Sequence, residues 1–423
     1  MSAMTTTIRS TSATPLAMPT FTDAVPTTSA DYIALEDEWG AHNYHPLDIV
    51  IERAAGSWVY DVDGKRYLDC LSAYSAINQG HCHPRILATM VEQAHRVTLT
   101  SRAFRNEQLP LFCEEVAAIC GMQSVLPMNT GAEAVETAIK AARRWGYEKK
   151  GIADGLAEIV VFENNFHGRT TTIVGFSSEP SYRAGFGPFT PGFKLIPYGD
   201  IEALRAAISP NTCAVLMEPI QCEAGILIPP HGYLRAAADL CRSENVLFMA
   251  DEIQTGLGRT GRMFACDHEE VQPDVYILGK ALAGGFYPVS AVVSSHEVLD
   301  VFRPGTHGST FGGNPLGCAV ARTALHVLQD EGLVQRSAEL GEWLKAQVSS
   351  IKHPDIKAVR GRGLMVGIEL HVPARQYCEA LMDRGMLCKE THDHVIRLSP
   401  PLVTSHEDLE WAMIQLRAVF ATS

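Results

Sequence analysis

Four short apolar runs recur along the middle of the chain, and each ends at or just before a polar or charged residue. They are EIVVFE (158–163), CAVLMEP (213–219), VLFMADE (246–252) and DVYILGK (274–280). Near-continuous apolar strands that alternate with helices are typical of a parallel sheet covered on both faces. Ligands bind at the carboxyl ends of the strands in such sheets, so Glu218, Asp251 and Lys280 are predicted to line one edge.

A helix is predicted over GAEAVETAIKAARRWGY (131–147), because its apolar residues recur on one stripe. The segment follows MNTG, in which Thr130 can cap the helix and Gly131 lets the backbone approach a ligand. The free amides of a helix N-terminus form an anion site. Taken alone, the feature is better explained as a capped helix start with nothing bound.

The two ends of the chain are predicted to form a smaller α+β domain. Residues 31–85 contain WVYDVDGKRYLDC (58–70), which reads as two strands joined by a turn, and residues 325–423 combine helical periodicity with strand-like VGIEL and VIRLSP. Residues 86–324 are assigned to the large α/β domain. Residues 1–30, rich in Ser, Thr, Ala and Pro, are predicted to be a disordered arm.

Composition narrows the class of function. The chain has 423 residues, 46% of them hydrophobic, and a formal net charge of -13, which disfavours nucleic acid and anionic membrane as partners. A small-molecule substrate is therefore expected, and no apolar run approaches the length of a membrane span. Eleven singly placed cysteines without a CxxC motif are typical of a reducing compartment. A cytoplasmic location is expected, with the mitochondrial matrix as the alternative.

Lys280 is the only basic residue in DVYILGKALAGGFYP (274–288). Most lysines lay an apolar stem over a surface and keep the ammonium in water. A desolvated lysine can instead act as a nucleophile and form a Schiff base with a carbonyl. If that carbonyl belonged to pyridoxal phosphate, Asp251 would be placed to stabilise the protonated ring nitrogen, and Gly131 with Ala132 could offer amides to the phosphate.

Two further residues suit the same cofactor. Phe166 in ENNFHGRTT could stack on the ring, and Gln254, three residues after Asp251, could hydrogen-bond the ring hydroxyl. Each signal is weak alone, but together and in this order they are specific.

A series of segments resembles the class III pyridoxal-phosphate aminotransferases in both content and order. They are LEDEWGAHNYHP, LSAYSAINQGHCHP, MNTGAEAVETA, NNFHGRTT, MEPIQCEAG, ADEIQTGLGRTG, LGKALAGGFYP, HGSTFGGNPLGC and VIRLSPPLV. The resemblance runs from about residue 35 to the C-terminus. It implies the α/β fold of the aspartate aminotransferases (fold-type I), with a large domain built on a mainly parallel sheet, a small α+β domain from both chain ends, and a homodimer.

The resemblance also implies a role for each of these residues. Lys280 would be the Schiff-base lysine that moves the proton, and Asp251 the partner of the ring nitrogen. Phe166, Gln254, Gly131 and Ala132 would take the contacts described above. Ser309 and Thr310 in HGSTFGG would contact the phosphate, with Thr310 reaching it from the neighbouring subunit. Association of dimers into larger assemblies is left open.

The reaction expected by resemblance moves the δ-amino group of L-ornithine to 2-oxoglutarate. Its amine donor has no carboxylate on the reacting carbon, whereas 2-oxoglutarate does, so a fixed cation beside that carbon suits only one of them. A switchable pair solves this problem: Glu223 would neutralise Arg397 with the amine and release it to bind the α-carboxylate. Cys222, before Glu223, departs from the usual IQGEAG pattern of the family.

Three residues are expected at the far end of the substrate. Arg169 in HGRT could bind a distal carboxylate, Tyr44 in HNYH offers a hydroxyl to the α-amino acid end of ornithine, and Tyr74 in SAYSA narrows the pocket. Without the resemblance, the arginines could equally be surface ion-pair residues and the tyrosines ordinary core aromatics.

Three alternatives remain. The donor could be acetylornithine, 4-aminobutyrate or lysine. The His-rich segments GHCHP, HNYH and THDHV could belong to a metal-dependent hydrolase, although none contains a recognised set of metal ligands and no metal site is expected. The chain could also bind the cofactor without turnover, against which intact Lys280, Asp251 and Arg397 argue.

Overall fold

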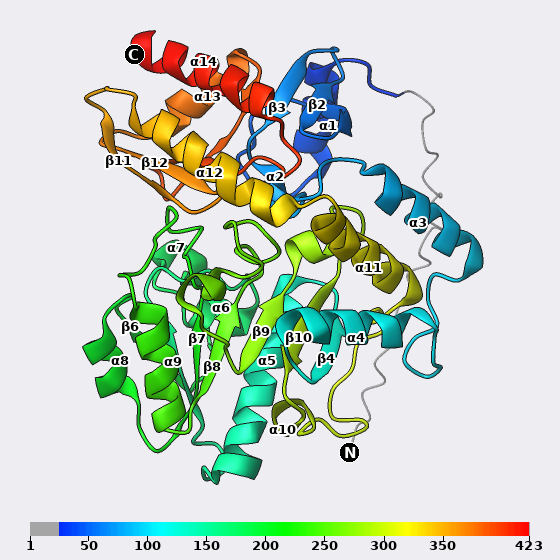
Figure 1. Ribbon diagram of the computed structural model, residues 1–423, viewed down its shortest axis with the longest axis vertical. Coiled ribbons are helices and arrows are strands. Elements are labelled where there is room, and N and C mark those ends of the chain that lie inside the picture. Colours follow the sequence, from blue (N-terminus) through cyan, green and yellow to red (C-terminus); the bar gives the residue numbers. More distant parts are fainter. Residues whose placement is uncertain (1–24, 423) are drawn as a thin grey trace, which may run out of the picture.

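The computed structural model describes residues 25–422 and consists of two unequal units (Figure 1). The larger unit is built on one wide sheet, and the smaller unit, above it in Figure 1, contains segments from both ends of the chain. Residues 1–24 of the predicted arm lie outside the described residues. The first helix begins at Ser29, within the last residues of that predicted arm.

The large unit contains a seven-stranded sheet with the order β4-β10-β9-β8-β7-β5-β6. Its strands are β4 (Ser124–Met128), β5 (Glu158–Phe162), β6 (Phe193–Ile196), β7 (Thr212–Met217), β8 (Leu247–Asp251), β9 (Val275–Leu278) and β10 (Ser290–Ser294). Neighbours from β9 to β6 pair in parallel, and β10 is antiparallel to both β4 and β9. The four apolar runs are β5, β7, β8 and β9, so the predicted parallel sheet is confirmed.

Alternate residues of the central strands belong to different cores. Ile159 and Val161 of β5 pack in the core that contains α5, whereas Val160 and Phe162 pack with α8 and α9 on the other face. Because successive side chains of a strand point to opposite faces, a run without polar residues requires cover on both faces.

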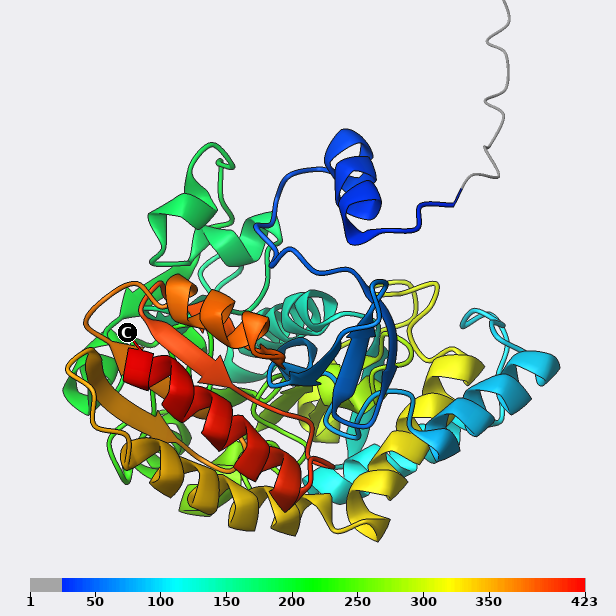
Figure 2. The same cartoon turned by 90° about the horizontal axis from the view of Figure 1, so that it is seen from above.

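The helices are distributed over both units. They are α1 (Ser29–Trp39), α2 (Ser72–Ser75), α3 (Pro84–Arg96), α4 (Gln108–Cys120), α5 (Gly131–Trp145), α6 (Thr171–Gly175), α7 (Pro180–Arg183), α8 (Ile201–Ala207), α9 (Tyr233–Ser243), α10 (His296–Leu299), α11 (Pro315–Asp330), α12 (Leu333–Ser349), α13 (Arg375–Asp383) and α14 (His406–Thr422), with short η1 (Gly146–Lys150), η2 (Ala265–Glu269) and η3 (Lys280–Ala283). Figure 2 shows α1 standing apart from the rest of the chain, and none of its residues is buried.

The small unit contains two four-stranded sheets, with the orders β1-β2-β3-β13 and β11-β12-β15-β14. Their strands are β1 (Ile51–Ala55), β2 (Trp58–Asp61), β3 (Arg66–Asp69), β11 (Ile356–Gly361), β12 (Val366–Leu370), β13 (Met386–Leu387), β14 (Lys389–Thr391) and β15 (Val395–Leu398). Met386 of β13 pairs in parallel with Leu68 of β3. One sheet therefore joins both ends of the chain. The predicted boundaries after residues 85 and 324 fall inside α3 and α11, because both helices continue across the change in composition.

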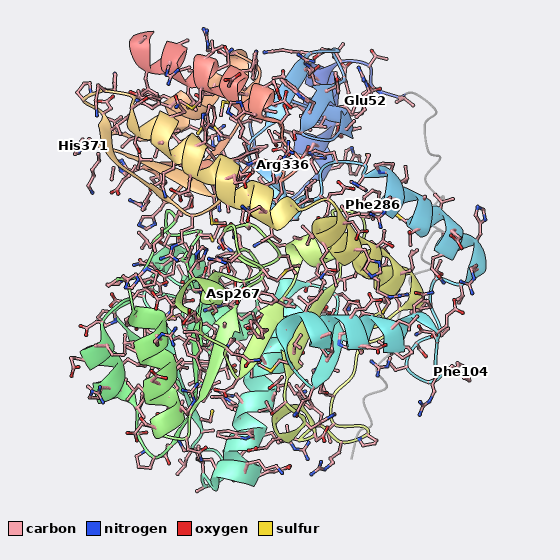
Figure 3. The ribbon with its side chains drawn as sticks, viewed as in Figure 1. Glu52, Phe104, Asp267, Phe286, Arg336 and His371 are labelled. Atoms are coloured by element: carbon pink, nitrogen blue, oxygen red, sulfur yellow. The ribbon has the colours of Figure 1, made fainter. Side chains whose placement is uncertain are left out.

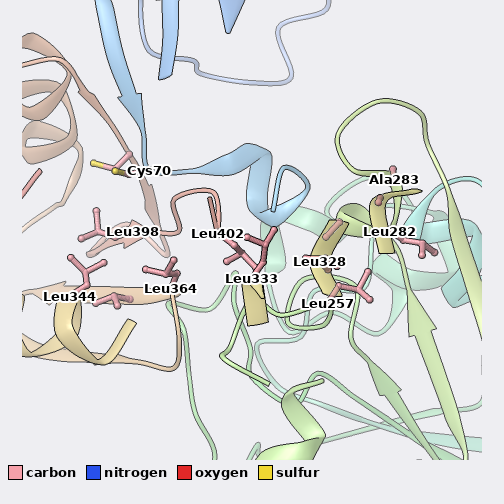
Figure 4. Close-up of a cluster of buried hydrophobic side chains, with 14 of the residues drawn as sticks. Cys70, Leu257, Leu282, Ala283, Leu328, Leu333, Leu344, Leu364, Leu398 and Leu402 are labelled. Atoms are coloured by element: carbon pink, nitrogen blue, oxygen red, sulfur yellow. The ribbon is translucent and has the colours of Figure 1, made fainter. Parts of the chain in front are cut away.

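A continuous hydrophobic core connects the two units. Figure 4 shows Leu333 and Leu402 between Leu364 on one side and Leu257 on the other, and all four are almost fully buried. Arg336 of α12, labelled in Figure 3, donates hydrogen bonds to the carbonyl of Thr404 at 3.0 and 3.2 Å. These bonds tie α12 to the segment before α14 within the small unit, and the shared core holds that unit against the large one.

Candidate active site

A cavity lies at the carboxyl ends of the central strands. Asp251 is the last residue of β8, Glu218 follows β7, and Lys280 comes two residues after β9. The cavity is lined by Gly131, Ala132, Phe166, His167, Gly168, Glu218, Ile220, Asp251, Ile253, Gln254, Thr255 and Lys280. The predicted lysine, its predicted carboxylate, the predicted stacking ring and the predicted phosphate amides therefore share one cavity.

Lys280 has an unusual backbone. Its φ is +42°, in the left-handed region that residues with a Cβ rarely occupy. The preceding Gly279 has an extended backbone, and η3 begins at Lys280 itself. Positions of this kind persist where the surrounding structure fixes them, and they concentrate at functional sites. The surrounding structure therefore fixes Lys280, whose side chain is half-buried, in an unfavourable backbone conformation.

Asp251 is held by a histidine to which the sequence analysis assigned no role. His167 Nδ1 lies 2.6 Å from Asp251 Oδ2, and the Ile253 amide donates to Asp251 Oδ1 at 3.1 Å. Asp251 and His167 are 4% and 3% exposed. Within the described residues, His167 Nε2 has no hydrogen-bond partner. The only sequence signal for His167 was its position directly after Phe166.

The start of α5 offers free donors to the cavity. Thr130 and Glu133 form a capping box that satisfies the Glu133 and Thr130 amides. Among the described residues, no acceptor takes a hydrogen bond from the Gly131 or Ala132 amide, and both residues line the cavity. Two free amides at the positive end of a helix fit a phosphate group.

Ser309 and Thr310 lie near this helix start but do not line the cavity. Asn129 Nδ2 donates to Ser309 Oγ at 3.1 Å, while Thr310 is exposed on the surface. Their contacts to a phosphate group stay a prediction.

A three-residue network of buried Arg397, buried Gln254 and half-buried Glu223 adjoins the cavity. Arg397 Nη1 donates to Glu223 Oε1 at 2.7 Å and to Gln254 Oε1 at 3.1 Å, and Arg397 Nη2 donates to Glu223 Oε2 at 3.3 Å. Gln254 Nε2 donates to Glu223 Oε1 at 3.1 Å. Burial acts to raise the pKa of Glu223, but the Arg397 charge outweighs it and lowers that pKa to about 2. The predicted pair is thus an ion pair at neutral pH.

Tyr74 lies in contact with this pair. The Arg397 Cζ atom is 4.8 Å from the centre of the Tyr74 ring. Residues 72–75, although labelled α2, all have positive φ and form a left-handed turn without a glycine. Left-handed turns cost about 1–2 kcal/mol for each such residue. The chain therefore maintains an unfavourable turn that places Tyr74 over Arg397.

A second cavity contains the other two predicted substrate residues. It is lined by Asn43, Tyr44, Arg169, Thr171, Val174, Ser181, Tyr182 and Phe186. Arg169 Cζ lies 3.6 Å from the centre of the Tyr182 ring, and Tyr182 meets Phe166 edge to face at 6.3 Å. Tyr182, which the sequence analysis did not single out, thereby connects the predicted stacking ring to the predicted distal arginine.

Glu218 is a buried carboxyl group that lines the cavity. Its Oε1 accepts a hydrogen bond from the Phe166 amide at 2.8 Å. Burial, assisted by the negative charge of Asp251, raises the pKa of Glu218 well above its ordinary value. The cavity therefore disfavours the charged form of the Glu218 carboxyl.

Both histidines of the segment GHCHP pair with carboxylates. His81 Nε2 pairs with Asp69 at 2.8 Å, and His83 Nε2 pairs with Glu331 at 3.0 Å. Over residues 25–422, no group of three or more His, Cys, Asp or Glu side chains could hold a metal ion. In the same part of the chain, no helix combines the length and apolar character needed to cross a membrane.

Comparison with known proteins places this site in a family. The family model for aminotransferase class-III matches residues 39–420. An ornithine aminotransferase of Brevibacillus brevis is 61% identical over 90% of this chain and 96% of its own length. One from Bacillus subtilis is 60% identical over 92% of this chain and 98% of its own length.

Solved structures agree with this placement. An ornithine aminotransferase from Toxoplasma gondii, described with partial occupancy of pyridoxal phosphate at its active site, superposes with a TM-score of 0.93 at 45% identity over 94% of this chain and 95% of its own. An acetylornithine aminotransferase from Elizabethkingia anophelis gives a TM-score of 0.86 at 47% identity over 93% of this chain and 99% of its own. The expected fold-type I architecture is confirmed, and the chain belongs to the class III aminotransferases, a family of pyridoxal-phosphate-dependent enzymes.

Proposed function

We propose that this enzyme transfers the δ-amino group of L-ornithine to 2-oxoglutarate, giving L-glutamate and glutamate 5-semialdehyde, which cyclises to pyrroline-5-carboxylate. The observation that carries the proposal is the Glu223–Arg397 ion pair, joined through Gln254 to the cavity of Lys280 and Asp251. The curated relatives named ornithine aminotransferase, at about 60% identity, support the same donor.

The cavity residues fit pyridoxal phosphate. The free amides of Gly131 and Ala132 would hold its phosphate, Phe166 would cover its ring, and the buried Asp251 would keep a proton on its ring nitrogen. Pyridoxal phosphate, when bound, supplies an aldehyde for the amino group and a protonated ring that withdraws electrons from the reacting carbon. Lys280 Nζ would take the proton from that carbon and return it during transfer.

The ion pair can serve both halves of the reaction. With ornithine, Glu223 holds the Arg397 guanidinium, so no free cation faces the δ-carbon. With 2-oxoglutarate or glutamate, the substrate's α-carboxylate replaces the Glu223 carboxylate on the same guanidinium. A buried arginine left without an anion would be strongly unfavourable, so each state needs one partner for Arg397. The planar fork of Arg397, 1% exposed, suits either carboxylate.

The second cavity suits the other end of both substrates. Arg169 is held against Tyr182, so its guanidinium is available to a carboxylate at a fixed place. Tyr44, which lines the same cavity, would donate its hydroxyl to the α-amino acid end of ornithine. Tyr74 would restrict access to Arg397 from the donor side.

We also propose a homodimer in which Thr310 completes the phosphate site of the neighbouring subunit. The exposed positions of Thr310 and of helix α1 support this assembly. A reducing, cytoplasmic location is supported by eleven free cysteines, nine of which are buried.

The donor is tested by measuring product formation from 2-oxoglutarate with L-ornithine, acetylornithine, 4-aminobutyrate and lysine in parallel. The proposal expects ornithine to give the highest kcat/KM and a product that cyclises to pyrroline-5-carboxylate. Acetylornithine is the strongest competitor, because a structural relative bears that name at 47% identity. A higher kcat/KM with acetylornithine would keep the chemistry and replace the proposed donor.

A further inference from the structure

The small unit holds the main chain at Glu223 and at the residues that follow it. Thr391 Oγ1 donates to the Glu223 carbonyl oxygen at 2.5 Å, and Thr391 is 5% exposed. Glu223 follows β7 of the large sheet, whereas Thr391 is the last residue of β14 in the small unit. This contact therefore crosses between the two units beside the ion pair.

Arg360 of β11 fixes the residues that follow Glu223. Its Nε donates to the carbonyl oxygens of Gly225 and Ile226 at 2.8 and 3.0 Å. Gly225 has φ +96°, and a Cβ there would lie 2.9 Å from Val395 Cγ2. The loop thus approaches the small-unit sheet so closely that Gly225 has no room for a side chain.

The same sheet carries the counter-ion of Glu223. Thr391 pairs with Val395, and Lys389 pairs with Arg397, in the hairpin of β14 and β15. Thr391 holds the Glu223 main chain from one strand of this hairpin, while Arg397 holds the Glu223 carboxylate from the other. A main chain fixed in this way lets the carboxylate leave Arg397 by side-chain rotation and return to the same place.

We infer that Thr391 is a positioning residue for the Glu223–Arg397 switch. It acts through the Glu223 carbonyl and lines neither of the two cavities. Without its hydroxyl, the Glu223 main chain loses a buried donor and the carboxylate returns less reliably to Arg397. Arg397 then remains free for longer, which disfavours the amine donor and leaves a substrate with an α-carboxylate largely unaffected. This inference rests on the proposed function of the ion pair.

The test measures the two half-reactions separately by rapid-mixing absorbance on the cofactor-loaded enzyme, one with L-ornithine and one with L-glutamate. Thr391→Val is expected to lower the ratio of the ornithine rate to the glutamate rate about tenfold, and Thr391→Ser to restore it to within about twofold. A merely structural role would lower both rates together and leave their ratio unchanged.

Thr404→Val is the matched control. Thr404 is a fully buried threonine of the same unit whose hydroxyl donates to Pro401 O at 2.6 Å, with no contact to the Glu223 loop. It is expected to reduce stability without changing the ratio. An equal loss in both half-reactions of Thr391→Val, or an equal change of ratio in Thr404→Val, would overturn the inference.

Arg360→Gln provides a second variant in case Thr391→Val does not fold. It removes the hydrogen bonds to Gly225 and Ile226, and the same lowered ratio is expected. An unchanged ratio in this variant would contradict the inference. If the wild-type enzyme reacts with glutamate but not with ornithine, the proposed donor fails; the ratio is then taken with the amine that does react, and it still decides the role of Thr391.

Discussion

His167 Nδ1 lies 2.6 Å from Asp251 Oδ2, and both side chains are almost completely buried. Because the Ile253 amide takes the other carboxylate oxygen, His167 is the side chain that fixes the orientation of Asp251. A buried carboxylate that loses a hydrogen-bond donor is destabilised in its ionised form. The strength with which Asp251 supports a protonated ring nitrogen should therefore depend on His167.

Replacement of His167 tests this dependence. His167→Leu removes the donor and is expected to weaken pyridoxal-phosphate binding about tenfold, since such a buried charged hydrogen bond contributes roughly 1.5–3 kcal/mol. His167→Asn can still donate and should lose less. Fluorescence titration of the cofactor-free protein with pyridoxal phosphate gives both dissociation constants. Equal affinities for wild type and His167→Leu would show that Asp251 needs no such support.

Tyr44 is predicted to select the donor. Tyr44→Phe keeps the ring in the second cavity but removes the hydroxyl, so kcat/KM for ornithine should fall about tenfold. The half-reaction with glutamate should change by less than about twofold, because it does not use this hydroxyl in the proposed pose. Steady-state assays with each donor measure the effect. If Tyr44→Phe lowers kcat/KM for ornithine and for 4-aminobutyrate by the same factor, Tyr44 does not select the donor.

The shared phosphate site predicts complementation between two defective chains. In a mixed dimer of Lys280→Ala and Thr310→Ala, one site carries both changes and the other carries neither. Co-expression with two affinity tags isolates this species, and it should recover about half of the wild-type turnover, one intact site in two. Recovery no greater than that of Thr310→Ala alone would mean that Thr310 serves its own subunit.

Glu252 predicts a specific pH dependence of stability. Burial raises the pKa of Glu252 from its ordinary 4.5 to about 7, so the folded protein keeps this proton over a range in which the unfolded chain has lost it. The contribution of Glu252 is therefore most favourable below pH 4.5 and is lost as the pH rises to about 7, by roughly 3 kcal/mol. Glu252→Gln can retain hydrogen bonds to Thr255 and the Cys266 amide without titrating.

Urea unfolding at pH 5, 6, 7 and 8 measures the free energy of unfolding for wild type and variant. The stability of Glu252→Gln relative to wild type should increase between pH 5 and 7 and then level off. Glu339→Gln, at an exposed position of α12, is the control and should follow the wild-type curve. A pH-independent difference between Glu252→Gln and wild type would contradict the assigned pKa.

The parallel part of the large sheet could be predicted because its strands are apolar without interruption, which is the pattern that burial on both faces imposes. The same argument gave no direction for β10, whose sequence SAVVS fits a parallel or an antiparallel strand equally well. Its antiparallel pairing with β9 and β4 depends on the path of the chain between the strands. The path of the chain between distant strands leaves no signal in the local sequence of either strand.

The residues of the site likewise fall into those that the sequence could indicate and those that it could not. Lys280, Asp251 and Gly131 could be found because each stands at the end of a strand or the start of a helix, where the chain pattern marks it. His167 could not, because its role depends on Asp251, which is 84 residues further along. The left-handed turn that carries Tyr74 lacks the glycine that usually signals such a backbone. Sequence reasoning therefore finds residues placed by secondary structure better than residues placed by tertiary contact.

The central claim is that Lys280 and the Glu223–Arg397 pair let one site accept an ω-amine and an α-keto acid in turn. The most direct test is the visible absorbance of the cofactor-loaded protein during addition of L-ornithine and then 2-oxoglutarate, with Lys280→Ala as the control. We predict that ornithine removes the visible absorbance band of the bound cofactor within one turnover and that 2-oxoglutarate restores this band. The Lys280→Ala variant should show no such cycle. A wild-type band unchanged by ornithine would contradict the proposed donor, and a cycle that persists in Lys280→Ala would contradict the role of the lysine.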